Sequence, residues 1–338
     1  MLVIMQQGAG QATIDHVVER IEQLGLRVHL SQGEFRTIIG AIGEELASYQ
    51  EQVLSLAGVE NVVPIMKPYK LASREFHPED SQVDVGGVKI GRGQCVVIAG
   101  PCAVEDREGC AAVAQSVKEA GATMLRGGAF KPRTSPYAFQ GMGEEGLKIL
   151  RECSDRYGLP VVTEVTDPRN VELVCRYADM LQIGARNMQN FVLLSEVGKT
   201  DKPVLLKRGP SNTVKDWLMS AEYILSEGNQ RVVLCERGSK GFETEVRFSL
   251  DVGAVVVARH NSHLPVIVDP SHAAGRRELV AELAIAGLAA GADGLIVEVH
   301  DCPEKARCDG AQSLTASMFT DLMGQVRQLL ACLGKDAG

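Results

Sequence analysis

The segment CVVIAG (residues 95–100) begins a pattern in which a short apolar run is followed by a polar loop and an amphipathic helix. Eight such runs occur in order: CVVIAG, TMLRG, PVVTEV, DMLQIG, PVLLK, RVVLCE, PVIVD and DGLIVEV. Amphipathic helices are expected between them, among others at residues 107–120, 144–157, 214–227, 276–290 and 314–333. Eight strands alternating with helices over about 240 residues predict an α/β fold, a (β/α)8 TIM barrel, with a doubly wound sheet as the alternative.

The residues before this pattern have a different order of elements. Strands are expected at 2–5, 27–30, 36–42 and 59–65, and helices at 12–24 and 44–56. This βαββαβ order is that of a small α+β ferredoxin-like domain, assigned to residues 1–66. Residues 67–94 are interpreted as a linker followed by a β-hairpin at VDVGGVKIG, and residues 95–338 as the barrel.

Composition limits the possible partners. The chain has 338 residues, a net charge of −8 and a pI of about 5.5, so no overall basic field would hold a nucleic acid or an anionic membrane. The longest apolar region, at 279–297, is interrupted by charged residues, and the N-terminus has no signal-peptide pattern. We therefore expect a cytoplasmic protein.

The nine cysteines contain no C-x-x-C pair, and a chain of this size does not need disulfides for stability. Most are expected to be reduced. Cys153, Cys175, Cys235 and Cys332 are expected to pack in or near the core, because cysteine is commonly a small buried hydrophobe.

The stretch LRGGAFKPRTSPY (residues 125–137) concentrates positive charge on a stiff loop. It carries Arg126, Lys131 and Arg133, while its glycines and prolines disfavour a helix. Arginine offers a planar fork of donors and lysine a compact charge, so the loop is expected to bind phosphate and carboxylate groups. A solvated basic surface loop is the alternative.

Polar or reactive side chains follow each of the eight runs. In a barrel these positions meet at one mouth. They are Cys102, Arg126, Glu164, Arg186, Lys207, Arg237, Asp269 with His272, and Glu298 with His300. Cys102, His272, Glu298 and Asp309 form a mixed set of soft and hard donors, which suits a divalent ion such as Mn, Fe, Zn or Co.

Several motifs together resemble a known family. They are GPCAVE, LRGGAFKPRTSPYAFQG, QIGARNMQNF, VLLKRG, LCERG, VDPSH, GRR, VEVH and DGAQSL. In this order they resemble the type I 3-deoxy-D-arabino-heptulosonate 7-phosphate synthases that carry an N-terminal ferredoxin-like regulatory domain. The resemblance implies a metal-dependent condensation of phosphoenolpyruvate with erythrose 4-phosphate and water, the first step of the shikimate pathway.

The resemblance also implies roles for individual residues. Arg186 and Arg237 would hold the phosphate of phosphoenolpyruvate, and Lys207 and Arg126 its carboxylate. Lys131 would lie between the substrates, and from its charge we expect it to donate to the developing alkoxide. The remaining assignments are Arg133 and Thr134 for erythrose 4-phosphate, and Cys102, His272, Glu298 and Asp309 for the metal ion.

Two other functions are considered. The related 3-deoxy-D-manno-octulosonate 8-phosphate synthases share the barrel but typically have K-A-N-R-S where this chain has KPRTS at 131–135. A non-catalytic sensor on the same scaffold would be expected to lack a ligand or a phosphate-binding cation, and none is missing. The resemblance further implies a homotetramer, and inhibition by an aromatic amino acid at the N-terminal domain, for which a purely structural domain is the alternative. Cys302 and Cys308 depart from the family pattern and place two thiols near the metal-binding loop.

Overall fold

The computed structural model describes residues 1–33, 36–43, 48–63, 68–133 and 135–337. The chain forms two compact units, Met1–Asp80 with His260–His263, and Ser81–Arg259 with Leu264–Gly338. Each unit has its own core, and they are described in turn.

The first unit contains a four-stranded antiparallel sheet in the order β2-β3-β1-β4. Its elements are β1 (Leu2–Met5), α1 (Gln11–Gln23), β2 (Arg27–Gln32), β3 (Thr37–Ile42), α2 (Gln50–Leu54) and β4 (Val59–Val63). Ile14, Val17 and Ile21 are spaced to lie on one face of α1, and all three are buried in the core of this sheet. The predicted ferredoxin-like order is confirmed; of the helix predicted at 44–56, residues 44–47 lie outside the described part of the chain.

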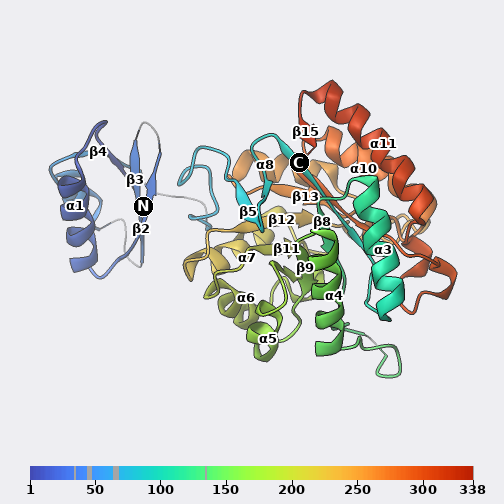
Figure 1. The fold of residues 1–338 in the computed structure, drawn as a ribbon. Coiled ribbons are helices and arrows are strands. Elements are labelled where there is room, and N and C mark those ends of the chain that lie inside the picture. The colour runs from blue at the N-terminus through green and yellow to red at the C-terminus, as the bar shows by residue number, and fades with distance from the viewer. Residues whose placement is uncertain (34–35, 44–47, 64–67, 134, 338) are drawn as a thin grey trace. The chain divides into compact units, whose positions relative to one another are not determined.

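The second unit is a closed barrel of parallel strands, with helices around it (Figure 1). The strands are β7 (Gln94–Gly100), β8 (Met124–Arg126), β9 (Val161–Glu164), β10 (Met180–Ile183), β11 (Val204–Lys207), β12 (Val232–Glu236), β13 (Val266–Val268) and β14 (Gly294–Glu298). Pairing of Gly294 with Val96 and of Glu298 with Gly100 closes the barrel. The TIM barrel is therefore confirmed, and the doubly wound sheet is excluded.

The outer helices surround the barrel, and several of them have capping residues at their ends. They are α3 (Arg107–Ala120), α4 (Glu144–Tyr157), α5 (Val171–Cys175), α6 (Phe191–Gly198), α7 (Val214–Ser226), α8 (Val252–Asn261), α9 (Pro270–Ala274), α10 (Val280–Ala289) and α11 (Ala316–Leu333). At the start of α3 the Asp106 side chain accepts from the Gly109 amide, and Gly121 ends the helix with a φ of 104°. These two signals explain why residues 107–120 were predicted with the correct ends.

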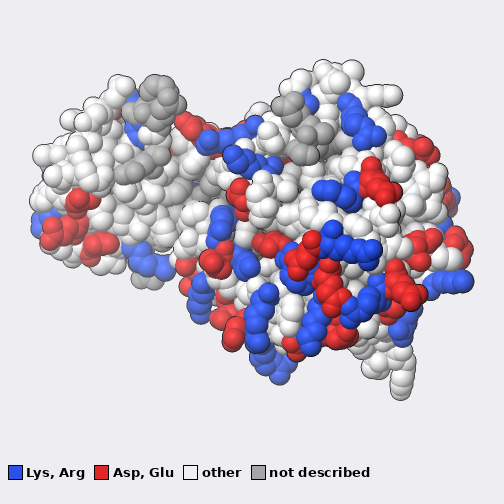
Figure 2. Space-filling view, viewed as in Figure 1, with Lys and Arg blue, Asp and Glu red and all other residues white. Residues whose placement is uncertain are grey.

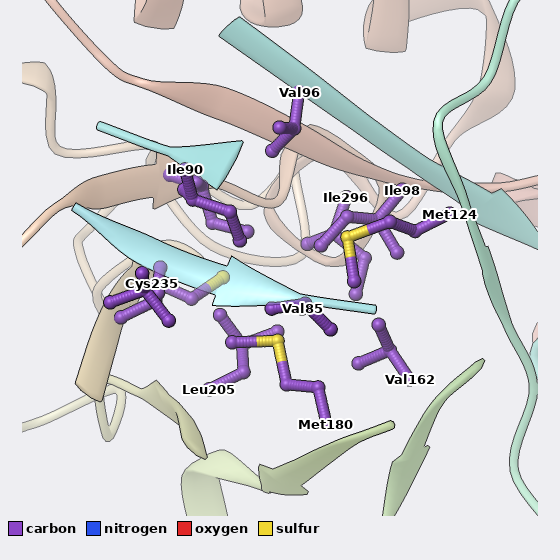
Figure 3. Close-up of a cluster of buried hydrophobic side chains, with 13 residues drawn as sticks. Val85, Ile90, Val96, Ile98, Met124, Val162, Met180, Leu205, Cys235 and Ile296 are labelled. Carbon is purple, nitrogen blue, oxygen red and sulfur yellow. The ribbon is translucent and has the colours of Figure 1, made fainter. Parts of the chain in front are cut away.

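A hairpin covers the amino-terminal end of the barrel. Its strands β5 (Val83–Val85) and β6 (Val88–Ile90) place Val83, Val85 and Ile90 against side chains from the barrel interior (Figure 3). The barrel side chains in this cluster are Val96, Ile98, Met124, Val162, Met180, Leu205, Val233, Cys235, Ile267 and Ile296. Because this end is filled with apolar side chains, the carboxyl ends of the strands are where a polar site can form.

The surface charges and the surroundings of the cysteines can be compared with the expectations from the sequence. On the face in Figure 2, basic and acidic side chains are intermixed over the barrel. Arg107, for example, forms ion pairs with Glu145 and Glu152. None of the described helices is long and apolar enough to cross a membrane. The nine cysteines are free thiols in the structure. Cys153 and Cys235 are buried and Cys175 is half-buried, but Cys332 is exposed on α11, so its predicted core packing is wrong.

Candidate active site

A pocket opens where the barrel strands end, and its walls are strongly basic. Seven of its lining side chains are cationic, and two are carboxylates. The lining residues are Arg126, Lys131, Pro132, Arg133, Glu164, Gln182, Gly184, Ala185, Arg186, Lys207, Pro210, Arg237, Arg247, Phe248, His272 and Asp309. The pocket is therefore suited to anionic ligands that carry several charges.

Two of the cations are buried and held by carboxylates. Arg126, at the end of β8, donates from Nη1 to Glu298 Oε1 at 2.6 Å, and Lys207, at the end of β11, pairs with Asp269. The Arg126 Nε is buried and has no hydrogen-bond partner among the described residues. Since a buried unpaired donor is costly, this guanidinium has unused capacity for a further anion.

The loop after β8 carries the next cations. Lys131 Nζ lies 3.0 Å from the Cys102 carbonyl oxygen and 3.2 Å from Cys102 Sγ. Glycine at 128 permits this approach, because a Cβ there would lie 2.8 Å from Lys131 Cδ. Burial opposes charge on Lys131, but Cys102, Cys308 and Glu164 raise its pKa. The ammonium therefore stays protonated at neutral pH.

Arginines complete the basic wall. Arg133 donates to Cys308 Sγ at 3.1 Å, Arg186 donates to the Pro132 carbonyl oxygen at 2.6 Å, and Arg237 lies over the Phe248 ring at 4.4 Å from its centroid. Thr134, predicted to bind the acceptor sugar, lies outside the described residues.

Donor atoms suitable for a metal ion gather beside these cations. Two groups of three have all their ligand atoms within 4.8 Å of one another. The groups are His272, Glu298 and Asp309, and Cys102, Cys308 and Asp309. Asp309 belongs to both groups, so the four predicted ligands and Cys308 form two neighbouring groups joined by this carboxylate.

The environment favours the protonation states that metal binding requires. Burial lowers the pKa of His272, which keeps the imidazole neutral at neutral pH. The pKa of Glu298 is lowered to about 2 although burial acts in the opposite direction, and the permanently charged Arg126, 2.6 Å away, is one cause. His272 Nδ1 lies 2.8 Å from Asp269 Oδ2, while Nε2 lies 3.4 Å from Glu298 Oε1. A neutral histidine beside ionised carboxylates fits a divalent ion.

Three contacts at the site were not identified from the sequence. Arg247 Nη1 lies 3.3 Å from Asp309 Oδ1, and Gln312 donates to Glu298 Oε2 at 2.7 Å. Cys308 was noted only as a thiol in the metal-binding loop. Arg247 lies in the long connection after β12, and no sequence pattern indicates that it belongs to the site. Gln312 lies within the DGAQSL motif, so the motif could have indicated it. His300, by contrast, lines a separate small pocket beside Glu105 and Asp301.

Comparison with known proteins gives the family. A model described as the DAHP synthetase I family matches residues 70–331, and one described as the DAHP synthase ferredoxin-like domain matches residues 1–67. The chain belongs to the DAHP synthetase I family. A phospho-2-dehydro-3-deoxyheptonate aldolase of Thermotoga maritima is 51% identical over 334 residues, which cover 99% of each chain. A crystal structure of the Thermotoga maritima aldolase has a TM-score of 0.80 with 50% identity, covering 100% of this chain and 99% of that one.

More distant relatives are named for a different sugar-acid product. A 2-dehydro-3-deoxyphosphooctonate aldolase of Desulfatibacillum aliphaticivorans is 37% identical over 247 residues, or 68% of this chain and 90% of that protein. The similarity to the octulosonate enzyme is thus lower and covers less of the chain, while the Thermotoga maritima protein matches along its whole length. The family resemblance of the sequence motifs is confirmed, and the octulosonate alternative is not favoured.

Proposed function

We propose that this protein condenses phosphoenolpyruvate with erythrose 4-phosphate and water to give 3-deoxy-D-arabino-heptulosonate 7-phosphate and phosphate. This reaction is the first step of the shikimate pathway. The observation that carries the proposal is the convergence of seven cationic side chains and a metal-type donor set on one barrel mouth. Two phosphates and a carboxylate bring about five negative charges at neutral pH, which such a wall can neutralise.

Each substrate is assigned to part of this wall. Arg186 and Arg237 hold the phosphate of phosphoenolpyruvate, and Lys207 and Arg126 hold its carboxylate. Arg133, with Thr134 assigned from the sequence alone, binds the phosphate end of erythrose 4-phosphate. Holding both substrates fixed brings the enol carbon close to the aldehyde carbon, which lowers the entropic part of the barrier.

Cys102, His272, Glu298 and Asp309 would hold a divalent ion, one of Mn, Fe, Zn or Co, which when bound polarises the aldehyde as a Lewis acid. Lys131 reaches the space between the two substrate positions. As the new carbon–carbon bond forms, its protonated Nζ donates to the developing alkoxide. Water then adds to the cationic carbon of the former enol, and inorganic phosphate leaves.

Substrate choice tests the proposal. Purified enzyme with added metal ion is expected to consume phosphoenolpyruvate and release phosphate with erythrose 4-phosphate, and much more slowly with arabinose 5-phosphate. Activity should be lost in a chelator and return with one of the four metals. Preference for arabinose 5-phosphate would instead indicate an octulosonate synthase.

Residues 1–66 are assigned as a regulatory domain, residues 67–94 as a linker with the hairpin, and residues 95–338 as the catalytic barrel of a cytoplasmic homotetramer. The match of residues 1–67 to the DAHP synthase ferredoxin-like domain supports the first assignment. Tyrosine or phenylalanine is expected to inhibit the full chain. Assays with each amino acid, and light scattering for the assembly, test these assignments; full activity at saturating tyrosine and phenylalanine would favour a structural role for the domain.

A further inference from the structure

Cys308 precedes Asp309 in the loop after β14, and its thiol faces the candidate metal ligands. The side chain is 2% exposed. Its Sγ lies 3.1 Å from Cys102 Sγ and 3.6 Å from Asp309 Oδ2. We propose that Cys308 supplies a second thiolate to the metal centre, so that this site favours thiophilic divalent ions such as Zn²⁺ over Mn²⁺. The inference rests on the metal site of the proposed function and adds a ligand to it.

The distances are close to those of a sulfur-rich tetrahedral site. Zinc–sulfur bonds of about 2.3 Å and zinc–oxygen bonds of about 2.0–2.2 Å put neighbouring donors roughly 3.3–3.8 Å apart. Asp309 Oδ2 lies 3.2 Å from Cys102 Sγ and 3.6 Å from Cys308 Sγ. The two sulfurs need to separate by only about 0.6 Å to bind one ion.

The two groups of donors share Asp309, so Cys308 is a candidate donor beside the four proposed ligands and not part of a remote site. His272 Nε2 lies 3.9 Å from Asp309 Oδ2, and the two thiols lie 3.2 and 3.6 Å from the same oxygen. Carboxylate and imidazole donors alone accommodate Mn²⁺, whereas each added thiolate favours a softer ion such as Zn²⁺. Cys308 thus adds a second soft donor to Cys102 and shifts the preference of the site further toward softer metal ions.

A positively charged side chain lies beside each of the two sulfurs. Lys131 Nζ lies 3.2 Å from Cys102 Sγ, and Arg133 Nη1 lies 3.1 Å from Cys308 Sγ. A metal ion binds the thiolate, and the positive charge of such a side chain complements the negative charge of a thiolate. Each sulfur therefore has its own cation.

The backbone around Cys308 is held on both sides. The Arg307 amide donates to Glu105 Oε1 at 2.7 Å, and Ser313 Oγ donates to the Asp309 carbonyl oxygen at 3.1 Å. The Arg307 guanidinium also lies 3.8 Å from the centroid of the Phe139 ring. These contacts fix the loop that directs Cys308 toward the site. Cys302, in the same loop, is half-buried, with its Sγ 3.9 Å from Glu304 Oε2.

Cobalt substitution tests the inference without an activity measurement. Reduced wild-type protein, Cys308→Ser, Cys308→Ala and the control Cys302→Ser are titrated with Co²⁺, whose thiolate charge-transfer band grows with each bound sulfur. We expect both Cys308 variants to retain about half of the wild-type band, since Cys102 remains, and Cys302→Ser to retain all of it. Competition between Zn²⁺ and Mn²⁺ should show a preference for Zn²⁺ that falls on the order of tenfold or more in the Cys308 variants.

A Cys102→Ser variant separates this inference from the proposed function. A full wild-type band in both Cys308 variants, with the band lost only in Cys102→Ser, would overturn the role of Cys308 and leave the metal site intact. Absence of a thiolate band from the wild-type protein would overturn both. Using serine and alanine at 308 keeps the test decisive if one variant does not fold.

Discussion

Replacing Asp269 by asparagine should weaken metal binding although Asp269 is not one of the proposed ligands. Its carboxylate is 1% exposed and faces two functional groups, Lys207 Nζ and His272 Nδ1. His272 Nδ1 lies 2.8 Å from Asp269 Oδ2. Burial would raise the pKa of Asp269, but it lies well below its usual range, with the Lys207 ammonium and the His272 amide among the causes. The ionised carboxylate thus turns His272 Nε2 toward Glu298 and Asp309.

The expected loss follows from the position of this carboxylate behind the histidine ligand. Removing such an outer partner typically costs about 10- to 100-fold in metal affinity, or roughly 1.4–2.7 kcal/mol. Buried Lys207 also loses its counter-charge, which should lower the free energy of unfolding by about 3 kcal/mol. Competitive titration against a chromophoric chelator measures the first effect, and chemical denaturation the second.

Asp293→Asn is the matched control. Asp293 is also buried and pairs with Arg259 at 2.9 Å, but it precedes β14 at the opposite end of the barrel. We expect this variant to lose stability without losing metal affinity. A folded Asp269→Asn protein that binds metal within about twofold of the wild type would refute the orienting role of Asp269.

Three further predictions concern catalysis and pH. Lys131→Ala should lower kcat by about 10²- to 10⁴-fold while phosphoenolpyruvate still binds, and a kcat within a few-fold of wild type in steady-state assays would contradict a proton-donating Lys131. Arg133→Ala should raise the KM for erythrose 4-phosphate by about 10- to 100-fold, and Arg186→Ala should do the same for phosphoenolpyruvate; equal effects on both substrates would contradict the division of the pocket. Burial lowers the pKa of His263 from 6.5 to about 4, although the Leu71 carbonyl opposes this shift. The neutral form of His263 therefore contributes about 3 kcal/mol to the free energy of unfolding, which is fully present above pH 6.5 and is lost as the pH falls to 4. In chemical denaturation at several pH values, the free energy of unfolding of His263→Asn should depend less on pH than that of the wild type.

Local sequence patterns were sufficient to predict the order of the strands and helices. The alternation of apolar runs with helices predicted the barrel, because each parallel strand must be buried on both faces and followed by a crossover helix. Capping residues fixed the ends of α3, and the paired glycines at 86 and 87 marked the hairpin. Outward and inward faces of a helix were harder to assign, as the exposed Cys332 on α11 shows, because that choice depends on neighbours distant in sequence.

The sequence by itself determined which residue types end each strand, and the barrel rule then placed Arg126, Lys207 and His272 at one mouth. Only the tertiary structure decided which groups touch. Cys102 and Cys308 are 206 positions apart, yet their sulfurs lie 3.1 Å from each other. Arg247 reaches Asp309 across 62 positions. The order of strands and helices can be predicted from the sequence pattern, and the barrel that it implies brings the strand ends together. Side-chain contacts instead depend on how separate loops fold over the same opening.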